Sequence, residues 1–103
     1  MLNQKVASLL NEQVNKEFYS AYLYLDFSNF YKSRSLDGYA NWYEIQAREE
    51  MDHAMMMIRY LQDNDHEVVL EAIDKPQCKL ESPEDPLHAG LEHERYVTKL
   101  IHT

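Results

Sequence analysis

Three acidic residues stand in the middle of apolar patterns that repeat at helical spacing. Glu17 lies seven residues from both Leu10 and Tyr24, a separation of two helical turns. Glu50 and Glu94 have the same position within two later apolar patterns. A buried ionised carboxylate is unfavourable unless it is paired or bound to a metal, so acids on three successive helices predict a shared cation site.

The second pattern also contains a histidine at ligand spacing. In the segment Glu50-Met51-Asp52-His53, the first and last residues lie one helical turn apart on the same side. Helical bundles that hold two irons use such a Glu-x-x-His pair together with single glutamates from other helices. Carboxylate-rich sites with one nitrogen donor favour iron or manganese over structural zinc. The motif is weak alone, but combined with Glu17 and Glu94 it predicts a two-metal site.

Three further polar side chains lie beside the acids. The phenol of Tyr24 can donate a hydrogen bond to a metal-bound carboxylate or be oxidised during oxygen chemistry. The alternative is an ordinary core aromatic, since the chain has eight tyrosines. Gln13 and Gln46 flank the patterns as further hydrogen-bond donors, although ordinary helix-surface polarity is the favoured interpretation for both.

Long helices must position these residues. The first is expected from about Asn3 to Ser33, which at about 1.5 Å per residue gives a length of roughly 45 Å. Its buried face is Leu10, Val14, Glu17, Ala21, Tyr24, Ser28 and Tyr31. The second is expected from about Asp37 to Asn64, with Asn64 as a left-handed cap residue. Its buried face is Tyr43, Ala47, Glu50, Ala54, Met57 and Leu61. Helices of this length are typical of a bundle or a coiled coil.

The connections predict how the helices are arranged. The short segment Ser35-Leu36-Asp37-Gly38 contains turn-forming residues, so we expect the first two helices to form an antiparallel hairpin. Residues 65–82 are long enough to cross the bundle, so a third helix would run parallel to the second. Ser82-Pro83-Glu84-Asp85 is a good helix start, with Ser82 as the cap and Pro86 as a possible shifted boundary. The third apolar face is Leu87, Leu91, Glu94, Val97 and Ile101.

Composition limits the function classes. The chain has 103 residues, enough for one domain, and 45% hydrophobic residues with only two glycines favour helices. A net charge of −8 disfavours nucleic-acid binding and can attract cations, with plain solubility as the alternative. The single cysteine, Cys78, excludes an intrachain disulfide and a multi-thiolate metal site. We expect no secretory signal and no membrane span, and therefore a cytoplasmic protein.

The chain resembles the bacterial-type non-haem ferritins, collinearly from about Val6 to its last residue. The segments that carry the resemblance are 9–17 (LLNEQVNKE), 22–25 (YLYL), 35–38 (SLDG), 49–54 (EEMDHA) and 92–97 (EHERYV). The resemblance implies an all-α, ferritin-like four-helix bundle. This chain would supply helices one and two and the start of helix three, as one truncated ferritin-like di-iron domain over residues 1–103.

The resemblance also implies an activity and its residues. Glu17, Glu50 and His53 would hold a first iron. Glu94 would hold a second iron, and Glu50 would bridge the two. Tyr24 matches a tyrosine beside that centre, and Glu49 an acid that helps to bind a third iron. Two ferrous ions would be oxidised by dioxygen or peroxide, and ferric product would be stored in a cage of twenty-four subunits. Hard anionic carboxylates suit this chemistry because they stabilise ferric iron.

The sequence departs from the family pattern at its end. It stops within the expected third helix, and the fourth helix with its further ligands is absent. The favoured interpretation is that it is a fragment of a longer chain. The alternative is a short chain that completes its bundle with a second copy, so that two sets of Glu17, Glu50 and His53 form a symmetric two-metal site.

Other functions are less favoured. Met51 matches a methionine that binds haem in related proteins, but many non-haem members share it, so haem is not expected. A di-iron peroxide reductase with a rubredoxin-like domain is excluded by the single cysteine. A truncated or structural bundle subunit without ferroxidase activity remains the alternative, and the retained Glu17, Glu50, His53 and Glu94 argue against it.

Overall fold

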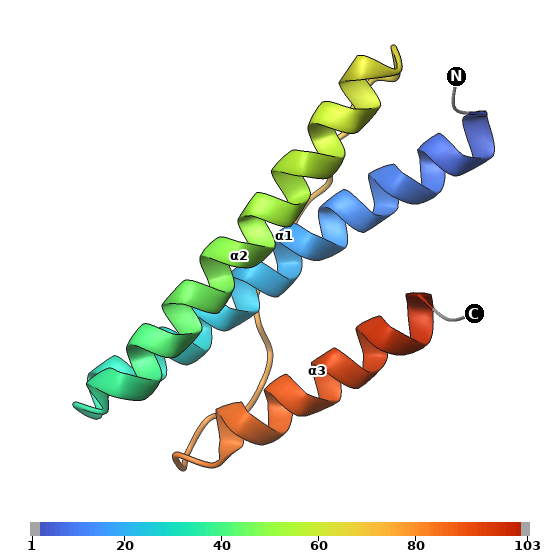
Figure 1. Ribbon diagram of the computed structural model, residues 1–103. Coiled ribbons are helices and arrows are strands. Elements are labelled where there is room, and N and C mark those ends of the chain that lie inside the picture. Colours follow the sequence, from blue (N-terminus) through green and yellow to red (C-terminus); the bar gives the residue numbers. More distant parts are fainter. Residues whose placement is uncertain (1–2, 102–103) are drawn as a thin grey trace.

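The protein is described by a computed structural model, in which residues 3–101 have a defined backbone and residues 3–96 defined side chains. It contains three helices, α1 (Gln4–Ser33), α2 (Asp37–Asp63) and α3 (Asp85–Ile101), and no strand occurs in this part of the chain. The first two form an antiparallel hairpin, and α3 runs parallel to α2 (Figure 1). The predicted all-α bundle architecture is confirmed, with extents of 48 × 24 × 20 Å.

Local capping explains where α1 begins and ends. The side chain of Asn3 accepts a hydrogen bond from the Val6 amide at 2.8 Å, which satisfies one of the free donors of the first turn. At the other end, Ser35 has a φ of 60° and the Leu36 amide donates to the Tyr31 carbonyl at 2.9 Å. This left-handed residue reverses the chain between α1 and α2. Both bounds agree with the sequence prediction to within one residue.

The prediction that Asn64 is the left-handed cap of α2 was wrong. Asn64 has a φ of −101°, and the left-handed residue is Asp65, with a φ of 58°. The amide of Asp65 donates to the Gln62 carbonyl, and the amide of His66 donates to Leu61, which is the hydrogen-bond pattern of a Schellman motif. The side chain of Asn64 instead donates a hydrogen bond to the Tyr60 carbonyl in the last turn of α2, one residue before the left-handed Asp65.

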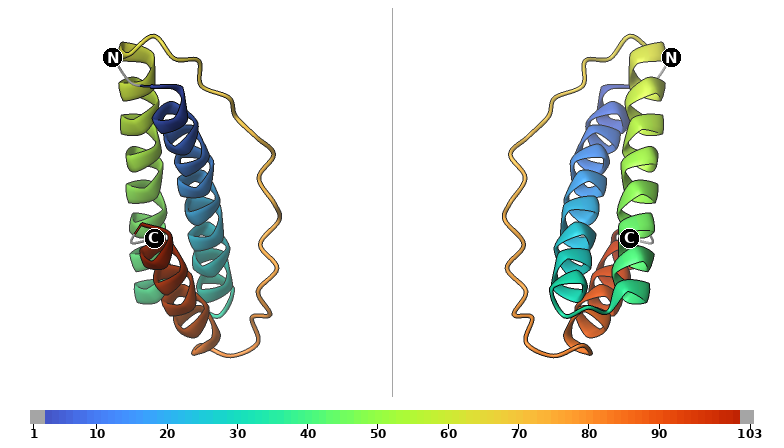
Figure 2. Two further views of the ribbon diagram at one scale, coloured as in Figure 1. Left: turned by 90° about the vertical axis from the view of Figure 1, so that its right-hand side faces the viewer. Right: turned by 90° about the vertical axis from the view of Figure 1, so that its left-hand side faces the viewer.

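The crossover, residues 65–84, runs along the length of the hairpin from the end of α2 to the start of α3 (Figure 2). Two asparagines of α1 hold it by hydrogen bonds to its backbone. Asn11 accepts from the Val69 amide at 2.8 Å and donates to the Val69 carbonyl at 3.0 Å. Asn15 accepts from the Glu71 amide at 2.8 Å and also donates to Val69. The predicted crossing of the bundle is confirmed.

The third helix begins later than its predicted Ser82 cap. Residues 82–84 form a turn, and α3 begins at Asp85 with Pro86 in its first turn, where proline is tolerated. The Asp85 carboxylate accepts hydrogen bonds from the amides of Glu81 and Ser82 at 2.8 and 2.9 Å. Asp85, on α3, therefore binds the backbone of Ser82. The start of the helix shifts from Ser82 to Asp85, which Pro83 and Pro86 both allow.

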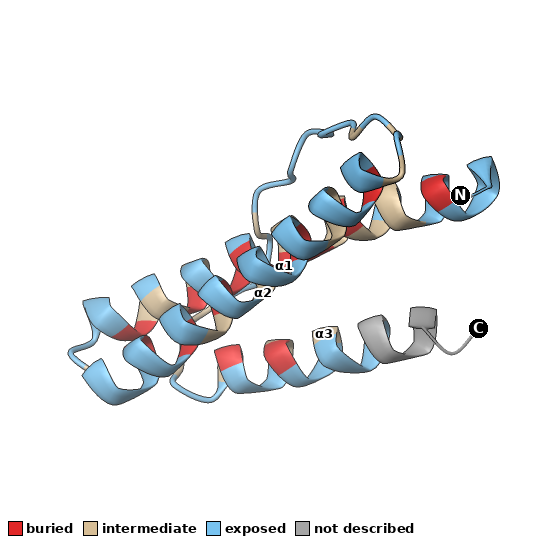
Figure 3. Cartoon of the chain, turned by 45° about the horizontal axis from the view of Figure 1, so that its top comes forward, coloured by how far each residue is buried: buried red, intermediate tan, exposed pale blue. Residues whose placement is uncertain are grey.

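The core lies between α1 and α2, as the red stretches of Figure 3 show. The predicted faces of both helices are largely buried, with Leu10, Ser28, Glu50 and Met57 partly exposed. On α3 the predicted face was wrong in part, because Leu87 and Leu91 are exposed and Pro86 and Gly90 are buried. A Cβ at Gly90 would lie 3.1 Å from the Tyr43 hydroxyl oxygen, so the missing side chain lets α3 approach the hairpin there. The predicted side-chain positions of Val97 and Ile101 lie outside the described residues.

Among the described residues, no helix combines the length and the hydropathy that crossing a membrane requires.

Candidate metal centre

Three of the predicted ligands converge between α1 and α2. Glu17, Glu50 and His53 each bring one donor atom to within 4.8 Å of the others. The Nδ1 atom of His53 lies 3.8 Å from a carboxylate oxygen of Glu17 and 3.7 Å from one of Glu50. Glu50 and His53 lie one turn apart on α2, as the Glu-x-x-His spacing predicts, and Glu17 faces them from α1.

The two carboxyl groups differ in their surroundings. Glu17 is buried, with 8% of its surface exposed, and accepts a hydrogen bond from the Gln13 amide at 2.9 Å. Burial, a hydrogen bond with Glu17 and the nearby carboxylates of Glu17, Glu94 and Glu49 together raise the pKa of Glu50 to about 8. Without a cation, the cluster therefore keeps a proton on Glu50 at neutral pH.

Glu94, on α3, is linked to the site through Tyr24. The Tyr24 hydroxyl donates a short hydrogen bond to the Glu94 carboxylate. Burial and that hydrogen bond raise the pKa of Tyr24 well above its ordinary value, so the phenol stays protonated. Glu94 is exposed and does not belong to the group of three converging donors, although its charge acts on Glu50. Tyr24 thus lies between the third helix and the cluster.

Glu49 and Gln46 lie at the edge of this arrangement. Glu49 is exposed and does not belong to the three-donor group, although its charge raises the pKa of Glu50. Gln46 lines a cleft of about 220 Å³ that also includes Tyr24, Tyr43 and Glu94. Of the two glutamines, only Gln13 has a hydrogen bond to a candidate ligand among the described contacts.

His93 and Ser20 form a contact that the sequence patterns do not identify. The Ser20 hydroxyl and the Nε2 atom of His93 are 2.6 Å apart and join α1 to α3. Burial lowers the pKa of His93, which favours the neutral ring. Since His93 directly precedes Glu94, this contact helps to hold the glutamate next to Tyr24. A lone histidine gives no periodic signal, so only the packing of α3 reveals it.

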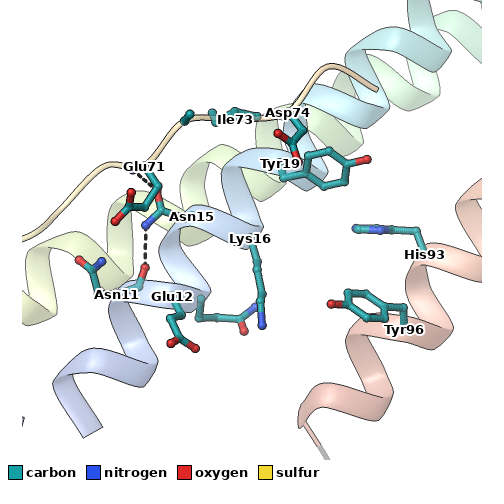
Figure 4. Close-up of a pocket in the computed structure, with 12 residues that line it drawn as sticks. Asn11, Glu12, Asn15, Lys16, Tyr19, Glu71, Ile73, Asp74, His93 and Tyr96 are labelled. Carbon is teal, nitrogen blue, oxygen red and sulfur yellow. Dashed lines mark hydrogen bonds between the residues drawn. The ribbon is translucent and has the colours of Figure 1, made fainter. Parts of the chain in front are cut away.

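His93 also lines a separate cleft of about 420 Å³ between α1, the crossover and α3 (Figure 4). Tyr19 and Tyr96 face His93 there, while Asn15 holds the crossover at Glu71. None of Glu17, Glu50 and His53 lines this cleft. The converging donors and this cleft are therefore two distinct features.

The donor set of the cluster suits iron. Carboxylate oxygens are hard ligands, and one imidazole beside them is the combination that non-haem iron and manganese sites use. A cation would also relieve the repulsion that raises the pKa of Glu50. The arrangement offers a cation three donor atoms between α1 and α2.

Comparisons with known proteins agree with this architecture. The model of the ferritin-like domain family matches residues 7–103. A bacterial non-haem ferritin of Campylobacter jejuni is 42% identical over 103 residues, which are 100% of this chain and 62% of that protein. One of Staphylococcus saprophyticus is 36% identical over 98 residues, 95% of this chain and 59% of that protein.

Solved structures show the same fold. A form of the Archaeoglobus fulgidus ferritin engineered to be closed superposes with a TM-score of 0.93 at 38% identity, over 99% of this chain and 62% of that chain. The open-pore ferritin of the same archaeon gives a TM-score of 0.92, over 99% and 63%. The chain spans about three fifths of the length of these relatives. With the family model matching nearly all of its residues, this chain belongs to the ferritin family.

Proposed function

We propose that this protein stores iron and oxidises ferrous to ferric iron at a carboxylate centre on α1, α2 and α3. Glu17, Glu50 and His53 would bind the first ferrous ion. Glu50 would bridge to a second ion that Glu94 also binds, and Glu49 would contribute to a third site nearby. Dioxygen or peroxide would accept the electrons.

The observation that carries this proposal is the convergence of Glu17, Glu50 and His53 within 4.8 Å in a partly buried place. Burial and nearby carboxylates raise the pKa of Glu50, which is the mark of a site that lacks compensating positive charge. Two ferrous ions would supply that charge. Carboxylates can then shift between terminal and bridging positions as the iron becomes ferric.

Membership of the ferritin family supports three wider expectations. The relatives that match are named as bacterial non-haem ferritins. We propose assembly into a cage of twenty-four copies, storage of the ferric product inside it, and a cytoplasmic location. The single cysteine, Cys78, is exposed and free, which fits a reducing compartment.

Ferrous oxidation tests the catalytic proposal. The protein, purified as it naturally occurs and freed of metal, is mixed with ferrous iron in air, and the ferric product is followed by absorbance. We expect Glu50→Ala to lower the initial rate by at least about tenfold, because the bridging ligand is lost. Glu44→Ala is the matched control, since Glu44 is an exposed acid on the same helix. Equal rates for the wild type and Glu50→Ala would contradict the enzymatic function and favour a structural subunit.

A further inference from the structure

Tyr43 is the junction of a group of aromatic rings that begins beside the candidate metal centre. Its ring centroid lies 5.8 Å from that of Tyr24, 5.9 Å from Tyr31 and 5.0 Å from Trp42. The ring of Tyr31 is stacked on Tyr39 at 5.1 Å. All these separations lie within the contact range of aromatic pairs. Oxidisable rings therefore touch in sequence from Tyr24 to the turn between α1 and α2.

The rings of this group differ in exposure, from buried beside the candidate metal centre to exposed at the turn between α1 and α2. Tyr24, Tyr43 and Tyr31 have at most 4% of their surfaces exposed. Tyr39 and Trp42 are 51% and 54% exposed, and both line the cleft at the turn between α1 and α2. The inner end of the group, Tyr24, is hydrogen-bonded to Glu94, and the outer end, Tyr39, is half exposed.

We propose that these rings form a relay that carries a one-electron oxidising equivalent from Tyr24 through Tyr43 and Tyr31 to Tyr39 at the surface. The relay rests on the proposed iron oxidation, which supplies the oxidant. It would protect the ligands of the buried centre, because damage moves to exposed side chains that soluble reductants can repair. Electron transfer falls steeply with distance, so rings in contact are favoured over any route through aliphatic side chains.

The chemistry balances with hydrogen peroxide as the oxidant. One ferrous ion and one hydrogen peroxide give ferric iron, hydroxide and a hydroxyl radical. That radical takes an electron from Tyr24 and becomes hydroxide, while the phenolic proton of Tyr24 moves to Glu94 along their hydrogen bond. Tyr24 becomes a neutral tyrosyl radical.

The radical then moves outward one ring at a time. Tyr43 gives an electron to Tyr24, which recovers its proton from Glu94, and Tyr43 loses its own proton to solvent in the adjoining cleft. Tyr31 and then Tyr39 continue the exchange, each giving an electron and its phenolic proton to the ring before it. An external hydrogen-atom donor, such as ascorbate or a thiol, finally reduces Tyr39.

Ordinary core packing would explain the same ring contacts but not a movement of oxidising equivalents. The test variant is Tyr43→Phe, which keeps the ring and its volume but removes the oxidisable phenol. It loses only a long hydrogen bond from the Tyr43 hydroxyl to the Pro86 carbonyl, at 3.4 Å. Ferrous oxidation by dioxygen should therefore stay near the wild-type rate.

The experiment adds hydrogen peroxide to the ferrous-loaded, naturally occurring protein in the presence of a nitroso spin trap. Mass spectrometry of its peptides then locates the adducts. Tyr22 and Tyr60 are the internal controls, since they are 49% and 50% exposed and take part in none of the described ring contacts. In the wild type we expect severalfold more adduct at Tyr39 than at either control tyrosine.

In Tyr43→Phe, adduct at Tyr39 should fall to the level of Tyr22 and Tyr60, and adduct at Tyr24 should rise. Unchanged Tyr39 labelling in this variant, or equal labelling of all exposed tyrosines in the wild type, would overturn the relay. Iron oxidation with adduct at Tyr24 alone would refute the relay and leave the proposed function intact. Absence of both iron oxidation and Tyr24 adduct would refute the two together.

Discussion

At the scale of single residues, the protonation of Glu50 depends on the negative charges that the fold places near it. It shares its surroundings with Glu17 and receives the charges of Glu94 and Glu49, while His53 is the only nitrogen donor of the three-residue cluster. In metal-free protein, the carboxyl group of Glu50 keeps its proton at neutral pH, since burial and the nearby carboxylates together raise its pKa to about 8. Ion binding and proton release are therefore coupled at this residue.

This coupling predicts how the stability of the metal-free protein depends on pH. Between the ordinary pKa of 4.5 and about 8, the folded state binds more protons at Glu50 than the unfolded state. The free energy of unfolding should therefore fall as pH rises through this window, by roughly 2 kcal/mol after allowance for solvent screening. Urea unfolding of the metal-free protein in EDTA, at pH values spaced by about one unit from 5 to 8, measures this fall in the free energy of unfolding.

Glu50→Gln removes the titrating group, so its free energy of unfolding should vary less with pH than that of the wild type. Glu44→Gln, on the exposed side of the same helix, should keep the wild-type pH dependence. An identical pH dependence for wild type and Glu50→Gln would show that the carboxyl group of Glu50 titrates normally.

At the scale of the elements, the crossover is held by side chains of α1 because it has no strand partner among the described residues. Asn11 and Asn15 supply both a donor and an acceptor to its backbone, as a neighbouring strand would. Since they lie one helical turn apart, they reach positions 69 and 71, two residues apart on an extended chain. The periods of helix and extended segment match at this contact.

We expect Asn15→Ala to loosen the crossover locally. The variant loses the bonds to the Val69 carbonyl and from the Glu71 amide, which should lower the free energy of unfolding by about 1 kcal/mol. Hydrogen exchange at the Glu71 amide should become faster. Asn29→Ala is the control, because Asn29 is an exposed residue elsewhere on α1. Unchanged exchange at Glu71 would mean that these hydrogen bonds do not hold the segment.

At the scale of the whole molecule, α2 and α3 leave an apolar surface open between them. Trp42, Leu87 and Leu91 are 54%, 44% and 51% exposed, and they line two neighbouring clefts. Soluble proteins rarely leave a contiguous apolar surface of this kind in water. The proposed assembly therefore predicts that this surface is covered in the protein as it occurs in solution.

Trp42 is the only tryptophan, so its fluorescence reports on this surface. In the assembled protein we expect emission at shorter wavelength than that of free tryptophan and weak quenching by acrylamide. Dissociation by dilution or mild urea, followed by sedimentation, should increase both the wavelength and the quenching. Quenching as strong as that of free tryptophan in the assembled state would show that the surface stays open.

The sequence alone determined the features that depend on neighbours along the chain. Helical periodicity and turn-forming residues predicted the bounds of α1 and α2 to within one residue, and the Glu-x-x-His spacing placed Glu50 and His53 on one side of α2. Periodicity also identified Glu17 as the partner on α1. These features follow from backbone geometry, which acts over three or four residues.

Only the tertiary structure decided the features that depend on how helices approach each other. The side of α3 that meets the hairpin carries Pro86 and Gly90, because small side chains allow close approach there, and this turns Leu87 and Leu91 outward. The same approach joins Glu94 to Tyr24, while the packing of α1 against α2 places the rings of Tyr24 and Tyr31 beside Tyr43. Periodicity identifies the apolar face of a helix, but the shapes of packed side chains determine which part of that face touches its neighbour.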